Sequence, residues 1–312
     1  MDNFLLSLNI VIPVFLIMGL GYAAKALKWM DDKSAKVMNS IIFKIFLPIL
    51  LCNNIRNADM SKLANVGVFV YTAVGLCVLF GVSMLLMPRI SKDGRRTGVL
   101  VQGICRANYA FLGLPLIAAM FPNQDTSVAS LMVAVTVPFY NALSVVALEI
   151  YRGGQIKLAK ILKNIAKNPL IIGCAAGLVL LLCGIELPGV LDKAMTDVGK
   201  AATPMALFLL GTSFSFGAVH GNEKALSFAV VMKLVVVPVI FVGGALLAGF
   251  RDVALASVLI AFGAPTAVSS FTMAQQMDGD DVLAGQIVVF TTLLSVISLV
   301  GFIFVFKQMG WL

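Results

Sequence analysis

Two polar residues, Asn108 and Tyr109, lie inside a long apolar stretch and shortly before Gly113-Leu114-Pro115. The stretch, residues 97–121, is long enough to cross a bilayer as a helix, but proline removes a backbone donor and clashes with the preceding turn. Lipid contains no water to repair such a break, so the break is tolerated only where protein or a water-filled cavity covers it. An amide and a phenol beside a helix break therefore indicate a binding site for a polar solute.

A second break of the same kind is predicted at Ala264-Pro265, within the apolar run 253–276. If each second half-helix begins with its proline in the first turn, where no donor is lost, it presents free N–H groups and about half a positive charge. Two such ends that meet at the membrane midplane suit an anion. We therefore expect the broken helices to cross at Gly113, Pro115, Ala264 and Pro265.

Three basic residues lie within apolar runs: Lys44, Arg106 and Lys233. A charge at the bilayer centre costs about 3 kcal/mol or more, so it is usually paired or functional. The acidic residues fall in predicted loops or at span ends, and Glu149 comes closest to the interior. Cations without deep acidic partners favour an anionic ligand. The alternative for all three is that the long side chains extend to the interface.

The residues expected to contact this anion are polar and lie beside the two breaks or in the run Pro138-Phe139-Tyr140-Asn141. They are Arg106, Asn108, Tyr109, Asn141, Thr266, Ser269 and Ser270. Amides and a phenol orient a carboxylate, hydroxyls donate to it, and the guanidinium adds charge. The alternative for the two asparagines is that they cap broken backbone or join helices, and the three hydroxyls could equally serve helix packing.

The elements that position these residues are those of an all-α integral membrane protein. Of the 312 residues, 60% are hydrophobic and 12% are charged, whereas about a quarter are charged in a soluble domain. The first apolar run follows Asp2 and is too long for a signal peptide, so it is predicted to be the first span. We predict ten spans, at residues 4–24, 37–53, 64–88, 97–121, 127–151, 168–184, 198–217, 225–249, 253–276 and 284–306.

The two halves of the chain have the pattern of a repeat. A basic connector, residues 152–167, separates five spans in residues 1–151 from five in residues 168–312. Pro48 and Pro204 occupy corresponding spans, as do the prolines of the two breaks. An odd number of spans in each half gives the halves opposite orientations. Interrupted helices at matching places in inverted repeats indicate a transport site at the midplane.

The distribution of Lys and Arg predicts the orientation of the spans. With the N-terminus outside, the inner loops hold fourteen basic residues, while the outer loops and C-terminus hold six, Lys200 among them. Both termini are thus predicted to be extracytoplasmic, and topology explains the net charge of +8 without nucleic acid. The acidic turn Asp278-Gly279-Asp280-Asp281 lacks the ligand spacing of a calcium loop. We interpret it as a solvated turn and expect no metal site.

The run Asn108-Tyr109-Ala110-Phe111-Leu112-Gly113-Leu114-Pro115-Leu116 resembles the fourth-helix signature of the auxin efflux carrier family. These membrane transporters include plant auxin exporters and bacterial malate and malonate permeases. Residues 140–145, 202–211 and 264–270 agree with the same family. The resemblance covers essentially all ten predicted spans. It implies ten transmembrane helices in two inverted five-helix repeats, as in bile-acid symporters and antiporters, with broken helices 4 and 9 crossing at their prolines.

The resemblance also implies that different spans have different roles. Spans 1, 2, 6 and 7 would form a scaffold and the surface of a homodimer, and spans 3–5 and 8–10 would form a transport domain that moves in an elevator-like cycle. Asn108 and Asn141 would contact the carboxylate of an organic anion. Plant members use an acidic residue of the third span in a proton-linked role, but residues 65–87 of this chain contain no acid.

We therefore expect a secondary transporter of small mono- or dicarboxylates, such as malate or malonate, in the plasma (inner) membrane, with no cofactor and no enzymatic activity. The alternative is a carrier coupled to Na⁺ or H⁺ with a cation-centred site, which would need a deep carboxylate. An intramembrane enzyme would need a motif such as HExxH, which the chain lacks. A structural or sensory membrane protein would show no flux. The anion, the coupling ion and the direction of transport are left open by the sequence.

Overall fold

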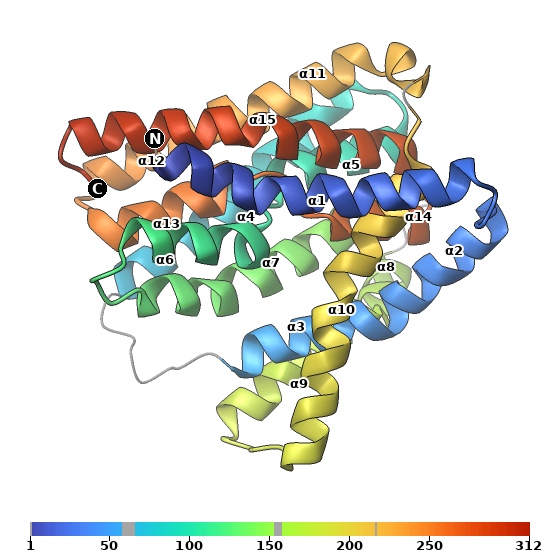
Figure 1. The fold of residues 1–312 in the computed structure, drawn as a ribbon, viewed down its shortest axis with the longest axis horizontal. Helices are drawn as coiled ribbons and strands as arrows, with labels where there is room; N and C mark the ends of the chain where they lie inside the picture. The colour runs from blue at the N-terminus through green and yellow to red at the C-terminus, as the bar shows by residue number, and fades with distance from the viewer. Residues whose placement is uncertain (1, 58–65, 153–157, 216) are drawn as a thin grey trace.

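The computed structural model describes residues 2–57, 66–152, 158–215 and 217–312, and every regular element in these ranges is a helix (Figure 1). In chain order the elements are α1 (Asp2–Ala26), α2 (Asp32–Ile41), η1 (Ile42–Phe46), α3 (Leu47–Arg56), α4 (Val66–Ile90), α5 (Gly94–Cys105), η3 (Tyr109–Gly113), α6 (Leu114–Met120), α7 (Ser127–Tyr151), α8 (Leu158–Ala166), α9 (Pro169–Leu182), α10 (Gly189–Ser213), η4 (Gly217–Gly221), α11 (Glu223–Val231), η5 (Met232–Val236), α12 (Val237–Leu247), α13 (Asp252–Gly263), α14 (Ser269–Gln276) and α15 (Asp281–Gln308). The predicted start of the third span at residue 64 lies outside the described residues, as do two of the basic residues counted in the loops, Lys62 and Lys157. The predicted seventh span ends at residue 217, whereas α10 ends at Ser213.

Six helical segments among the described residues are long and apolar enough to cross a membrane. They are Asp32–Arg56, Val66–Ile90, Gly94–Met120, Ser127–Tyr151, Glu223–Leu247 and Asp281–Gln308. Three shorter apolar helices accompany them: Val11–Ala26, Pro169–Leu182 and Asp252–Gly263. The chain is therefore a multi-pass membrane protein. The predicted count of ten spans and their inverted repeat stay predictions.

One predicted boundary is wrong, because α10 begins at Gly189 and not at residue 198. The first turns of α10 contain Asp192, Lys193 and Asp197, which lower the hydropathy on which the prediction relied. These residues are nevertheless compatible with a helix, and Asp192 forms an ion pair with Arg56 at the end of α3.

Proline is accommodated in three of the helical segments by a widened turn. The π-turns η1, η3 and η5 each end directly before a helix whose second residue is proline, namely Pro48, Pro115 and Pro238. Proline lacks an N–H and crowds the carbonyl one turn earlier, and a π-bulge relieves such a conflict without ending the helix. A proline in an apolar run of this chain therefore does not by itself mark a break.

The interrupted helices form the centre of the molecule. In α5 every residue from Thr97 to Cys105 is buried, and α13 is buried over Leu255–Gly263. Large apolar side chains of α1, α4 and α9 are instead exposed, for example Leu20, Val74 and Leu182. This arrangement places polar, irregular backbone inside protein and apolar side chains outside, as a lipid environment requires.

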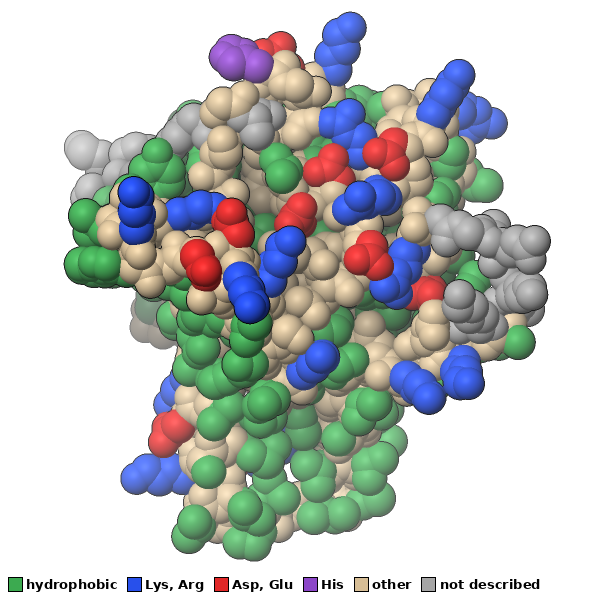
Figure 2. Space-filling view, turned by 90° about the vertical axis from the view of Figure 1, so that its right-hand side faces the viewer, with side chains coloured by type: hydrophobic (Ala, Val, Ile, Leu, Met, Phe, Trp, Pro, Cys, Tyr) green, Lys and Arg blue, Asp and Glu red, His purple; other side chains and the backbone are tan. Residues whose placement is uncertain are grey.

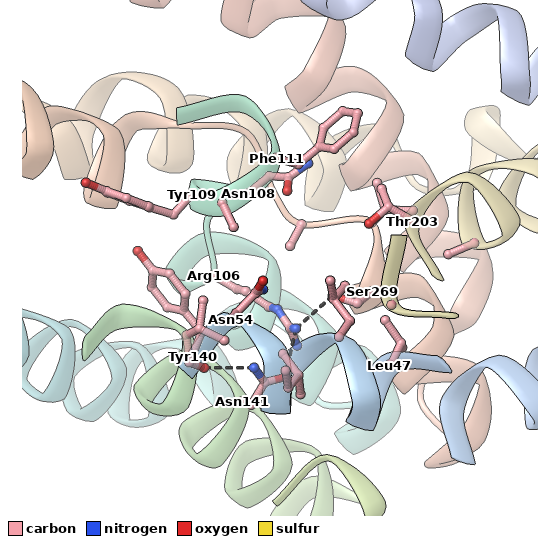
Figure 3. Close-up of a pocket in the computed structure, with 18 of the residues that line it drawn as sticks. Leu47, Asn54, Arg106, Asn108, Tyr109, Phe111, Tyr140, Asn141, Thr203 and Ser269 are labelled. Atoms are coloured by element: carbon pink, nitrogen blue, oxygen red, sulfur yellow. Dashed lines mark hydrogen bonds between the residues drawn. The ribbon is translucent and has the colours of Figure 1, made fainter. Parts of the chain in front are cut away.

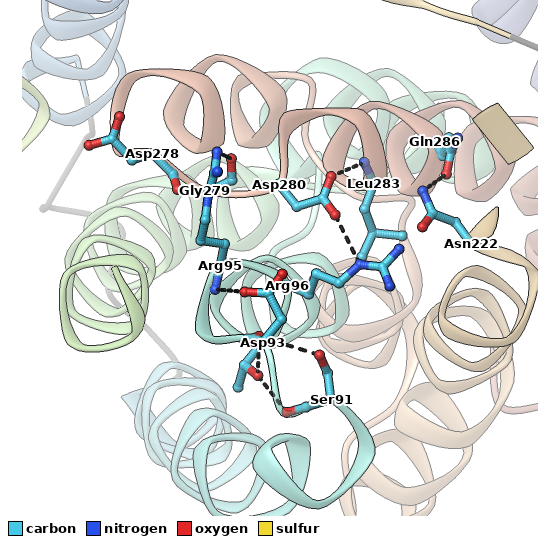
Figure 4. A network of polar contacts seen from close by, with 11 residues as sticks. Ser91, Asp93, Arg95, Arg96, Asn222, Asp278, Gly279, Asp280, Leu283 and Gln286 are labelled. Carbon is cyan, nitrogen blue, oxygen red and sulfur yellow. Dashed lines mark hydrogen bonds and ion pairs between the residues drawn. The ribbon is translucent and has the colours of Figure 1, made fainter. Parts of the chain in front are cut away.

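Figure 2 shows charged side chains gathered at one end of the molecule, the end near α2 and α14 in Figure 1. There the acidic turn between α14 and α15 is held by arginines of α5 and of the connector. Arg96 Nε lies 3.0 Å from Asp280 Oδ2, and Arg95 Nε donates to the Asp278 carbonyl at 2.7 Å (Figure 4). Arg152 Nη2 lies 2.5 Å from Asp278 Oδ2. The turn predicted to be merely solvated is therefore a bonded link between the two halves of the chain.

Glycine permits a close crossing of α1 and α10. A Cβ on Gly21 would lie 2.0 Å from the Phe208 carbonyl oxygen, and a Cβ on Gly211 would lie 2.0 Å from the Met18 carbonyl oxygen. Nothing lies within 4 Å of the equivalent position on Gly19. Small residues that let helix backbones approach are a common basis of packing in membranes.

Gly21→Ala should therefore destabilise the protein by about 1–3 kcal/mol, because the added methyl group forces the two backbones apart. Gly19→Ala, on the same helix, should be neutral or slightly stabilising, because alanine favours a helix over glycine. Thermal unfolding of both variants in detergent measures the difference. Equal melting temperatures for the two variants would show that the crossing is looser than described.

Candidate functional site

The first half-helix of the fourth predicted span ends at Cys105, and the backbone of Arg106–Asn108 is not helical. The chain then re-enters η3 and α6 without a further interruption. We expected the break at Gly113 and Pro115, so that expectation is wrong by about two turns. The π-turn η3 explains the difference, because it absorbs the proline of α6.

The second break lies at Ala264–Val268, between α13 and α14, and it contains Ala264 and Pro265 as expected. Pro265 lies before α14 and not in its first turn. The two breaks are joined directly, since the Asn108 N–H donates to the Pro265 carbonyl at 2.8 Å. Two interrupted segments far apart in the sequence thus meet through their backbones.

Carbonyl groups released at the ends of α5 and α13 are capped by side chains from elsewhere in the fold. Thr266 Oγ1 donates to the Gly103 carbonyl at 2.7 Å, and the Tyr140 hydroxyl donates to the Ala261 carbonyl at 2.6 Å. Lys233 Nζ lies 3.2 Å from the Phe262 carbonyl oxygen. The last turn of any helix leaves carbonyls without intrahelical partners, and these three bonds satisfy such groups where water is excluded.

A cavity of about 340 Å³ opens beside the two breaks (Figure 3). It is lined by Leu47, Leu50, Leu51 and Asn54 of α3; by Arg106, Ala107, Asn108, Tyr109, Ala110 and Phe111 of the first break and η3; by Val137, Tyr140 and Asn141 of α7; by Gly199, Lys200, Thr203, Pro204 and Ala206 of α10; and by Ala267, Val268 and Ser269 of the second break and α14. The second halves of both interrupted segments begin at its wall, so both helix N-termini contribute positive potential there.

Arg106 is one of two basic residues that line this cavity, with Lys200, and it is only 4% exposed. One guanidinium nitrogen, Nη2, donates to Asn141 Oδ1 at 2.9 Å and to Ser269 Oγ at 2.7 Å, and Nη1 contacts the Met273 sulfur. None of the ion pairs among the described residues involves Arg106. A buried guanidinium with only neutral partners is poised for a carboxylate, which it can bind through two parallel hydrogen bonds.

The structure gathers five of the seven predicted ligand residues around the cavity: Arg106, Asn108, Tyr109, Asn141 and Ser269. The other two do not line it. Thr266 is buried and caps Gly103, and its N–H donates to Thr291 Oγ1 at 3.1 Å. Ser270 is buried, its backbone carbonyl accepts from Gln102 Nε2 at 3.3 Å, and its hydroxyl has no hydrogen-bond partner among the described residues. For Thr266 the packing interpretation is favoured.

Four polar cavity residues were not predicted: Asn54, Tyr140, Lys200 and Thr203. Tyr140 directly precedes Asn141 in the same run, so its neighbour was a usable signal. Lys200 was assigned to an outer loop, and that assignment is wrong, because it lies within α10. Lys200 had been counted with the outer loop although it stands at the start of the predicted span 198–217, and nothing in the sequence of α3 singled out Asn54.

Interrupted helices that meet beside a cavity in a multi-pass membrane protein are typical of membrane transport proteins. Residues 6–303 match the family described as "Membrane transport protein", and the chain belongs to that family. This match confirms the resemblance to the auxin efflux carriers.

Three relatives have names that agree with this class. The chain is 22% identical to an "Uncharacterized transporter" of Methanothermobacter thermautotrophicus, with 95% of this chain and 97% of the relative covered. It is 24% identical to a "Putative malonate transporter" of Rhizobium meliloti, with 96% of each chain covered. It is also 24% identical, over 72% of each chain, to an uncharacterized transporter of Methanocaldococcus jannaschii. The family and these relatives are transporters and not enzymes.

Thr266→Val should destabilise the protein by about 1–3 kcal/mol, because it leaves the buried Gly103 carbonyl without a donor. Thr203→Val, at the cavity wall on α10, should change the free energy of unfolding much less. Thermal unfolding in detergent compares the two. A Thr266→Val protein as stable as the Thr203→Val protein would mean that the Gly103 carbonyl has another donor.

Proposed function

We propose that this chain is a secondary transporter of small organic anions, most of all mono- or dicarboxylates such as malate or malonate. The observation that carries the proposal is Arg106, a buried cation whose hydrogen-bond partners are the neutral side chains of Asn141 and Ser269. Isolated charges inside a membrane protein are costly and usually serve function. A bound carboxylate would supply the counter-ion that none of the described residues provides.

The remaining cavity groups fit such a substrate. Asn108 and Asn141 offer amide groups beside the guanidinium, and Ser269 offers a hydroxyl. Asn54 and Lys200 line the cavity from α3 and α10 and are suited to the second carboxylate of a dicarboxylate. A volume of about 340 Å³ is at the small end of ligand pockets. The name of the R. meliloti relative supports the same class of substrate.

Transport would follow from movement of one group of helices against another. The helix α3 packs along α9 and α10, and α1 packs along α10, whereas α5 packs along α7 and α4, and α12 packs along α13. The cavity is lined by α3 and α10 on one side and by the two breaks and α7 on the other. We propose that α1–α3, α9 and α10 form the scaffold of a ten-span inverted repeat, and that the other helices carry the anion in an elevator-like cycle.

We further propose that the charged end in Figure 2 faces the cytoplasm of a cell with this protein in its plasma (inner) membrane. Positively charged loops favour that side, and both termini lie at the opposite end in Figure 1. A cation-centred site, the alternative considered from the sequence, would need acidic ligands at the cavity. None of the described residues that line it is Asp or Glu.

Arg106→Gln tests the proposal. Malonate and malate should raise the melting temperature of the wild-type protein, since a ligand that binds only the folded state stabilises it. The variant should bind at least about tenfold more weakly, because a hydrogen bond to a charged group contributes about 1.5–3 kcal/mol. It should still fold, because replacing an unpaired buried charge relieves desolvation.

Lys44→Gln, which removes an exposed lysine of η1 that does not line the cavity, is the matched control and should bind like the wild type. Asn141→Ala should weaken binding without removing it, since one of several contacts is lost. The rates of carboxylate uptake into proteoliposomes should rank the wild type and the variants in the same order as their carboxylate affinities do. Unchanged carboxylate affinity in Arg106→Gln would place the site elsewhere.

A further inference from the structure

A second cavity, of about 560 Å³, lies at the charged end of the molecule. It is formed by the end of α4, the start of α5 and the start of α11, and its wall includes Ile90, Ser91, Arg96, Asn222, Lys224 and Phe228. The described residues of this wall include none that lines the cavity beside the two breaks. Carboxylate binding as proposed above therefore makes no use of it.

The second cavity lies where two membrane-spanning segments end. Ile90 is the last residue of the segment Val66–Ile90, and the segment Glu223–Leu247 begins at the cavity wall. The two segments are antiparallel neighbours, because the Tyr71 hydroxyl, near the other end of α4, donates to the Phe241 carbonyl of α12 at 2.5 Å. Lipid headgroups lie at the level where spanning helices leave the hydrocarbon core, so the cavity is at headgroup depth.

Arg96 presents hydrogen-bond donors to this cavity. Among the described residues its guanidinium bonds only to Asp280, through Nε at 3.0 Å, and Figure 4 shows its two terminal nitrogens directed away from that carboxylate. A guanidinium fork of this kind matches two oxygens of a phosphate. Exposed Lys224 adds a second cation to the wall, and exposed Arg89 and Lys92 are chain neighbours of two wall residues.

The start of α11 adds backbone donors. Asn222 is at the N-cap, where an asparagine side chain commonly accepts from an amide of the first turn, but its Nδ2 donates to Gln286 Oε1 at 2.8 Å and no described side chain caps the helix. The first three residues of α11 line the cavity, and amides at such positions have no intrahelical acceptor. The acidic wall residue, Glu223, lies 3.0 Å from His220 Nδ1 and is engaged there.

The surfaces that lead from the cavity toward the middle of the bilayer are apolar. Val82, Leu85 and Leu86 of α4 are exposed, as are Val231 of α11 and Val235 of η5. In a membrane such side chains contact acyl chains, because lipid cannot satisfy polar groups. An occupant of this cavity would therefore meet cationic donors at headgroup depth and apolar side chains below them.

We propose that this cavity binds the headgroup of an anionic phospholipid from the leaflet at the charged end. Its phosphate would lie against Arg96, Lys224 and the first turn of α11, and its acyl chains would extend along α4 and α11–α12. Basic pockets between transmembrane helices are suited to anionic headgroups, whereas the quaternary ammonium of a zwitterionic lipid would be repelled. The proposal needs no carboxylate site, so it can fail or hold independently of the proposed function.

Native mass spectrometry of the purified full-length protein, titrated with phosphatidylglycerol or phosphatidylcholine, tests this. The wild type should bind phosphatidylglycerol at least about fivefold more tightly than phosphatidylcholine. Lys224→Gln and Arg96→Gln should each weaken phosphatidylglycerol binding about fivefold, the contribution of one basic residue at an anionic surface. Lys33→Gln, which removes an exposed lysine of α2 outside the cavity wall, is the control and should bind like the wild type.

Lys224 is exposed, so Lys224→Gln should fold, and the test stands even if loss of the Asp280 bond unfolds Arg96→Gln. Equal affinity for the two lipids, or equal affinities of Lys224→Gln and Lys33→Gln for phosphatidylglycerol, would overturn the site. Inorganic phosphate is the second probe, and it should raise the melting temperature less than phosphatidylglycerol does. An equal rise with inorganic phosphate would overturn the assignment to a lipid.

Discussion

The structure depends on one constraint, which is that backbone polar groups inside a membrane protein need partners. Two helical segments are interrupted at the centre of this chain, and each interruption releases amides and carbonyls that lipid cannot satisfy. The Asn108 amide pairs with the Pro265 carbonyl, and Thr266 and Tyr140 cap the ends of α5 and α13. The breaks are therefore stable only as a crossed pair, and the cavity exists because this pair keeps irregular backbone inside protein.

The crossing of the two interrupted segments also concentrates positive potential on the cavity side. The second half-helices begin at the cavity wall, where Arg106 also lies, so that side carries positive potential without a described counter-ion. The first half-helix α5 ends at Cys105, directly before the cavity residue Arg106, and Lys233 lies against the last turn of α13. A carboxylate in the cavity would thus interact with a cation and with helix N-termini at once.

Much of the fold and of the candidate site was predictable from the sequence, and each wrong prediction has an identifiable physical cause. Composition and long apolar runs indicated a helical membrane protein, and polar residues beside Pro115 and Pro265 indicated the two segments that meet. The first break was misplaced because a π-turn absorbs Pro115, and a sequence does not show whether a proline is absorbed or ends a helix. Lys200 was missed because it was counted with the outer loop, although it stands at the start of the predicted span 198–217 and within α10. Thr266 was assigned to the ligand because its real acceptor, the Gly103 carbonyl, is distant in the chain.

A structure of the protein with bound malonate in a lipid nanodisc tests the central claim most directly. The account predicts a malonate carboxylate within hydrogen-bonding distance of the Arg106 guanidinium, in the cavity beside Asn108, with the bonds from Arg106 to Asn141 or Ser269 replaced by bonds to the acid. Malonate bound outside this cavity, with Arg106 still bonded to both Asn141 and Ser269, would contradict it.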